Sequence, residues 1–146
     1  MSDNYFIDTN IVIYAHSDID LTKQNIAQKL LSSDNAYLST QVLQETINVF
    51  SKKNKHNWNE IEKIIVELIS NNPILKNNEQ TILKAAKVAA NYKFSFYDSL
   101  IISSALECNC SILYSEDMNA NQVIDDKLTI INPFTINITL ADIPIT

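Results

Sequence analysis

Short apolar segments alternate with helical patterns along most of this chain, and this alternation limits its fold more than any other feature. NYFID at residues 4–8, NAYLS at 35–39, SILYS at 111–115 and TIIN at 129–132 have the length and apolar content of short strands. Strands that are separated by helices predict an α/β domain with a mainly parallel sheet. Helical spacing of apolar residues is found over about 9–15, 21–32, 40–53, 59–70, 79–92 and 96–106.

The length of 146 residues fits one domain, expected over 1–134. The tail at 135–146 alternates apolar and polar residues, which favours an edge strand or an interface arm. No apolar stretch is long enough to span a membrane, and the start MSDNYFIDTN lacks the basic and apolar regions of a signal peptide. We therefore expect a cytoplasmic protein that makes no contact with membranes.

The composition excludes several classes of site. Because the chain has no glycine, it cannot contain a Walker A loop, a GxGxxG dinucleotide turn or a GxSxG nucleophile elbow. All basic residues are lysine, so arginine clamps on phosphate are excluded within the chain. The net charge of −6 argues against broad electrostatic binding to nucleic acid, but it leaves open binding that a metal ion mediates. Asparagine is expected to replace glycine at left-handed turn positions.

Four acidic residues are placed where a parallel sheet gathers its ligands. Asp8 and Asp117 follow the apolar strands at 4–8 and 111–115. Glu45 lies in the second turn of one predicted helix, and Asp98 lies in the first turn of another. Since ligands of such folds bind outside the carboxyl ends of the strands, these four side chains are expected at one edge of the sheet.

Each acid also has an ordinary explanation. Asp8 could be a helix N-cap, and Asp98 could complete a capping box with Ser95, three residues before it. Glu45 could be a solvated glutamate on its helix face, and Asp117 a turn residue. It would be a coincidence if four acids at the same edge of one sheet each had such an unrelated explanation.

A shared location of four carboxylates requires a counter-charge. Like charges 4 Å apart repel by roughly 4 kcal/mol at a protein-surface dielectric. A divalent cation removes this conflict, and oxygen ligands without clustered His or Cys favour Mg²⁺ or Mn²⁺.

The order FIDTN, LQE, FYDSLI, SED and NPF resembles the PIN domain, and most closely the VapC-type ribonuclease toxins of toxin–antitoxin pairs. The resemblance covers about Asn4 to Phe134 and implies a three-layer α/β/α fold. It also implies that Asp8, Glu45, Asp98 and Asp117 form an acidic metal site. Supporting roles are implied for three further residues: Asn10 would brace Asp8, Ser115 would line the pocket beside Asp117, and Thr9 could contribute a hydroxyl or serve only as an N-terminal helix residue. The place of Glu116 is left open, and Asn121 stands where glycine is common.

The function implied by the resemblance is Mg²⁺- or Mn²⁺-dependent endoribonuclease activity that leaves 5′-phosphate and 3′-hydroxyl ends. The implied partners are an RNA substrate, a cognate antitoxin protein and a second copy of the chain in a homodimer. Local affinity for RNA could come from Lys52, Lys53 and Lys55, which could equally be a solvated helix end.

Two other functions are left open. A phosphatase could use Asp8 as its nucleophile, although such enzymes usually need a second acid where this chain has Asn10. A PIN fold with an idle site could bind RNA or protein without catalysis, although such relatives normally lose acids and this chain keeps all four.

Overall fold

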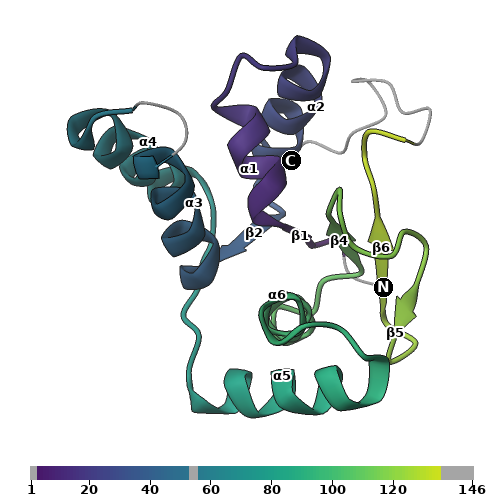
Figure 1. Ribbon diagram of the computed structural model, residues 1–146. Helices are drawn as coiled ribbons and strands as arrows, with labels where there is room; N and C mark the ends of the chain where they lie inside the picture. Colours follow the sequence, from purple (N-terminus) through teal and green to yellow (C-terminus); the bar gives the residue numbers. More distant parts are fainter. Residues whose placement is uncertain (1–2, 53–55, 136–146) are drawn as a thin grey trace.

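The structure is a computed structural model that describes residues 3–52 and 56–135, and it confirms the predicted α/β fold with a mainly parallel sheet (Figure 1). The strand order is β3-β2-β1-β4-β6-β5, and only the β5–β6 pair is antiparallel. The strands are β1 (Tyr5–Ile7), β2 (Ala36–Ser39), β3 (Ile74–Leu75), β4 (Ile112–Tyr114), β5 (Val123–Ile124) and β6 (Leu128–Ile131). The helices are α1 (Thr9–Ala15), α2 (Leu21–Leu31), α3 (Thr40–Lys52), α4 (Trp58–Asn71), α5 (Glu79–Tyr92) and α6 (Phe96–Glu107).

Helices cover both faces of the sheet. Figure 1 shows α1 and α2 on one side and α5 and α6 on the other, with α3 and α4 as a pair next to β2. Within the described part of the chain, no helix has the length and apolar character needed to cross a membrane.

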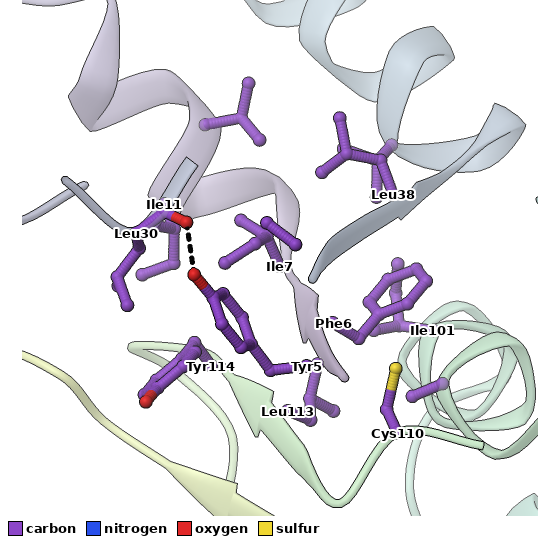
Figure 2. Packing of buried hydrophobic residues seen from close by; sticks show 14 of the residues in the cluster. Tyr5, Phe6, Ile7, Ile11, Leu30, Leu38, Ile101, Cys110, Leu113 and Tyr114 are labelled. Atoms are coloured by element: carbon purple, nitrogen blue, oxygen red, sulfur yellow. Dashed lines mark hydrogen bonds between the residues drawn. The ribbon is translucent and has the colours of Figure 1, made fainter. Parts of the chain in front are cut away.

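The core is centred on β1, which has a buried side chain at every position (Figure 2). Tyr5 is only 2% exposed, and its hydroxyl donates a hydrogen bond of 2.6 Å to the carbonyl of Leu30 in α2. Its ring meets that of Tyr114 in β4 edge to face, with centroids 5.2 Å apart. A central strand that is buried on both faces reads as a continuous apolar run, which explains the sequence YFI. This packing fixes the register of β1 against β4, on which the site depends.

Two strands were not predicted, β3 and β5. Each has only two residues, which is too short for a period to be recognised in the sequence. The predicted arm at 135–146 lies outside the described residues except for Thr135.

Five of the described residues have the left-handed backbone conformation, although none of them is glycine. Asn109 and Asn121 have φ of 56° and 72°, which confirms that asparagine replaces glycine there. Lys93 ends α5 in the same conformation. Asp125 and Asp126 adopt it in the turn between β5 and β6.

Candidate active site

Asp8 lies at the carboxyl end of β1, next to the residue that follows β4. Ile7 and Tyr114 are paired in the sheet, and the backbone N–H of Asp8 donates to the carbonyl of Tyr114 at 3.0 Å. Ser115 therefore lies beside Asp8, and its hydroxyl donates to Asp8 Oδ2 at 2.7 Å. The other carboxylate oxygen accepts from the backbone N–H of Thr9 at 2.8 Å, so Asp8 is also the N-cap of α1. The capping role and a place in the site are thus compatible.

Asp117 is joined to the same group through Ser115 and Asn10. Its Oδ1 accepts from the Ser115 hydroxyl at 3.2 Å and from Asn10 Nδ2 at 2.9 Å. The resemblance implied that Asn10 braces Asp8. In the structure Asn10 instead bonds to Asp117, and its amide oxygen accepts from the backbone N–H of Glu116 at 3.3 Å. Asn10 thus fixes the loop after β4 to the start of α1.

Glu45 reaches this edge from the second turn of α3. It accepts a hydrogen bond of 2.6 Å from the hydroxyl of Thr9 and a longer one of 3.4 Å from Gln41 Nε2. The half-buried Glu45 is therefore tied to the residue after Asp8, and it is not a freely solvated glutamate. The hydroxyl role that the resemblance gave to Thr9 corresponds to this contact.

Asp98 lies in the first turn of α6, which Ser95 caps by accepting from the backbone N–H of Asp98 at 3.2 Å. Burial raises the pKa of Asp98, and the charges of Asp117 and Glu45 raise it further, while a hydrogen bond with Ser95 lowers it. Each of these acids therefore lies within electrostatic reach of Asp98.

Asp8 is the most strongly perturbed acid of the group. Burial raises its pKa to about 7, and the charges of Asp117 and Asp98 add to the rise, against hydrogen bonds from Ser115 and Thr9 that lower it. Burial is thus the main reason why Asp8 resists ionisation, and the neighbouring acids add to the effect. The structure therefore brings all four predicted acids to one edge of the sheet.

The comparison with known families identifies the fold around this edge. A family model for the PIN domain matches residues 5–125, which is most of the chain. The chain belongs to the PIN domain family. No curated protein sequence matches it.

Solved structures with a similar fold include toxins and toxin–antitoxin complexes. VapC20 of Mycobacterium tuberculosis, described as a sarcin-ricin loop cleaving toxin, has a TM-score of 0.62 at 14% identity, over 78% of this chain and 90% of that one. A toxin–antitoxin complex from Klebsiella pneumoniae has a TM-score of 0.68 at 15% identity, over 91% and 100%. VapBC2 from Rickettsia felis, bound to a DNA fragment from its promoter, has a TM-score of 0.59 at 20% identity, over 77% and 87%. At these identities the likeness concerns the fold.

The donors of this PIN domain suit a hard divalent cation. They are carboxylate and hydroxyl oxygens, which Mg²⁺ and Mn²⁺ prefer. Across residues 3–52 and 56–135, no three side chains of His, Cys, Asp or Glu form a ready-made metal-binding group. An ion held here would take its remaining ligands from water, as Mg²⁺ usually does. The donor chemistry thus fits Mg²⁺ or Mn²⁺, with part of the coordination left to solvent or substrate.

Glu116 has partners outside the four acids, in a group that we call the Glu116 cluster: Tyr14, Lys23, Glu116 and Phe134. Lys23 Nζ lies 2.5 Å from Glu116 Oε2, and the hydroxyl of Tyr14 donates to Oε1 at 2.8 Å. The ammonium group of Lys23 also lies 4.8 Å and 5.2 Å from the ring centroids of Tyr14 and Phe134. Both oxygens of Glu116 are therefore engaged, and its charge is compensated by Lys23.

Sequence reasoning missed Gln41 and the Glu116 cluster. Gln41 precedes Glu45 by one helical turn, and this spacing is a signal that could have found it. Lys23 and Glu116 are 93 positions apart, and no local pattern relates them. A separate hollow of about 740 Å³ lies between α1, α2 and α4, and none of the four acids lines it.

Proposed function

We propose that this PIN-domain protein is a divalent-metal-dependent endoribonuclease and the toxin of a toxin–antitoxin pair. The observation that carries the proposal is the gathering of Asp8, Glu45, Asp98 and Asp117 at one edge of the sheet, where their charges act on one another. Acids so placed are costly to the fold unless a cation compensates them.

The four acids would hold Mg²⁺ or Mn²⁺ against a phosphate of the RNA backbone. When bound, the ion supplies positive charge at the scissile phosphate and lowers the pKa of a water molecule. Ser115 donates to both Asp8 and Asp117, so it sets the spacing of these two carboxylates. The hydroxyl of Thr9 positions Glu45, because its hydrogen bond fixes Glu45 Oε1 beside the start of α1.

Asp117 is the acid best placed to accept a proton from the attacking water. It is exposed, whereas Asp8 is only 6% exposed. Both hydrogen bonds that the described residues make to its side chain fall on Oδ1. Its Oδ2 thus keeps its capacity to accept a proton, and Asn10 holds the group in position while it does so.

The test is RNA cleavage by the purified protein with Mg²⁺ or Mn²⁺ and then with EDTA, comparing Asp8→Asn and Asp98→Asn with wild type. Asp126→Asn is the matched control, because Asp126 is exposed and lies in the β5–β6 turn. We expect cleavage in wild type and Asp126→Asn only, and none after chelation. Cleavage that survives EDTA, or that is undiminished in both site variants, would rule the proposal out.

A phosphatase with Asp8 as nucleophile fits less well. Asp8 is buried, and both of its oxygens already accept hydrogen bonds, from Thr9 and Ser115. The position two residues on is Asn10, which binds Asp117. Trapping of a phosphoryl adduct on Asp8 would reverse this ranking. A PIN fold with an idle site would show RNA or protein binding without any cleavage.

The partners and the domain limits belong to the same proposal. The toxin–antitoxin complex from Klebsiella pneumoniae with this fold supports an antitoxin partner, whose loss should make the protein toxic on expression. A homodimer would appear as twice the chain mass in light scattering. The catalytic domain would span 1–134, with 135–146 as an interface arm, in the cytoplasm. Of the lysines considered for RNA binding, Lys52 is exposed at the end of α3, and Lys53 and Lys55 lie outside the described residues.

A further inference from the structure

Two aromatic side chains stand exposed directly before Asp98 in the candidate site. Tyr97 is 66% exposed and Phe96 is 40% exposed, although the rest of α6 from Ser99 to Ala105 is buried. Their rings meet edge to face with centroids 5.4 Å apart. The helix that supplies Asp98 to the site thus begins with a pair of rings in solvent.

The backbone of Tyr97 is held by the site itself. Gln41, which is 5% exposed, donates from Nε2 to the carbonyl of Tyr97 at 3.1 Å and to Glu45 Oε2 at 3.4 Å. The same amide group therefore links the residue bearing the exposed ring to one of the four acids. A ring anchored in this way has little freedom at its backbone, which lowers the entropic cost of binding a ligand on it.

Because the protein is acidic, its affinity for RNA needs a contribution that is not ionic. The net charge is −6 and the chain has no arginine, so its phosphate contacts depend on lysine alone against an overall negative charge. Stacking of a base on an aromatic ring needs no counter-charge, and it works for every base because each has a π-face.

We propose that Phe96 and Tyr97 form a stacking platform for an unpaired nucleobase of the RNA, next to the phosphate that is cleaved. A base within a duplex already has both faces stacked, so the platform selects single-stranded or looped RNA. This inference rests on the proposed function and adds a base-binding site beside the acids. The occupant is a nucleobase and not a second copy of the chain, because Tyr97 directly precedes Asp98 and its backbone is linked through Gln41 to Glu45, and both acids would hold the metal and its phosphate.

The test measures RNA affinity separately from cleavage. Fluorescence anisotropy would follow a labelled 12-nucleotide single-stranded RNA and a duplex of equal length, with Ca²⁺ as the divalent ion and the RNA checked for integrity afterwards. The variants are Tyr97→Ala, Tyr97→Phe and the control Trp58→Ala, since Trp58 is 68% exposed on α4, which supplies none of the four acids. Light scattering of each variant would report its mass.

We expect Tyr97→Ala to weaken single-strand binding by about 5- to 150-fold, and to raise KM more than it lowers kcat. Tyr97→Phe should bind as wild type does because it keeps the ring, and Trp58→Ala should bind as wild type does because it leaves the platform intact. Duplex affinity should not depend on residue 97.

Unchanged single-strand affinity in Tyr97→Ala would overturn the platform, as would an equal loss in Trp58→Ala. A change of mass in Tyr97→Ala would also overturn it, because the rings would then pack against a second copy. If wild type still cleaves RNA in an Asp8-dependent way in these cases, the nuclease proposal stands without the platform. If wild type neither binds nor cleaves RNA, both proposals fail.

Discussion

Replacing Asp8 by Asn should stabilise the ion-free protein, and by an amount that depends on pH. The pKa of Asp8 rises from its ordinary value of 3.8 to about 7 in the folded protein. Each pKa unit corresponds to about 1.4 kcal/mol. Ionised Asp8 therefore lowers the free energy of unfolding by about 4 kcal/mol in the absence of a cation, as an upper estimate for a side chain that can relax.

The sign of the effect follows from the direction of the shift. A carboxyl group whose pKa is raised by folding leaves stability fully present below pH 3.8, and that stability is lost as the pH rises to about 7. Asparagine is uncharged and nearly isosteric with the protonated acid, and it can still accept from the N–H of Thr9. The advantage of Asp8→Asn over wild type should thus grow from about 2 kcal/mol at pH 5 to about 4 kcal/mol at pH 8.

Urea unfolding followed by circular dichroism, in EDTA at pH 5, 6.5 and 8, measures this difference. Asp126→Asn serves as the control, because it makes the same substitution at an exposed acid in the β5–β6 turn. Adding Mg²⁺ should narrow the gap at pH 8, because an ion bound only by the folded wild type stabilises it. An Asp8→Asn protein that is no more stable than wild type at pH 8, or whose advantage is the same at pH 5, would refute the reasoning.

Three further outcomes are expected. Ser115→Ala removes a buried hydroxyl donor that Asp8 and Asp117 share, so it should lower the free energy of unfolding by about 1–3 kcal/mol in urea titrations. Ser111→Ala should lower it by less, because Ser111 is only half buried. In a double-mutant cycle of Lys23→Met and Glu116→Gln, the coupling energy should be under about 1 kcal/mol and should shrink in high salt, because both side chains are about 30% exposed. A coupling energy that does not depend on salt would contradict the description of this pair as a partly exposed ion pair. Mg²⁺ should raise the melting temperature of wild type more than that of Glu45→Gln in differential scanning fluorimetry, and equal shifts would remove Glu45 from the site.

The sequence predicted the architecture because its strongest signals are local. The central strand β1 is a continuous apolar run, and the predicted helices have apolar residues at helical spacing or a capping residue such as Ser95. The sequence did not predict β3 and β5, which have two residues each. Each of these strands forms only by pairing with a neighbour that is remote in the chain or that follows a turn. Pairing of this kind is a tertiary effect that short segments do not encode.

The site was predictable to the extent that topology alone places it. Parallel strands bring their carboxyl ends to one edge, and this rule alone predicts that Asp8 and Asp117 lie together. The contacts among side chains were not predictable in the same way. Asn10 was assigned to Asp8 but binds Asp117, and the choice between two acids a few ångströms apart depends on rotamers that no sequence pattern specifies.

Because Asp8 and Ser115 pair although they are 107 positions apart, the acidic edge cannot form until most of the chain has been synthesised. During translation, the first of the four acids emerges from the ribosome long before the strand that must lie beside it. An N-terminal fragment, however well its helices form, has no complete acidic edge until β4 and the loop after it have been made and β4 has paired with β1. Prematurely terminated products that end before Asp117 should therefore lack the complete group of four acids.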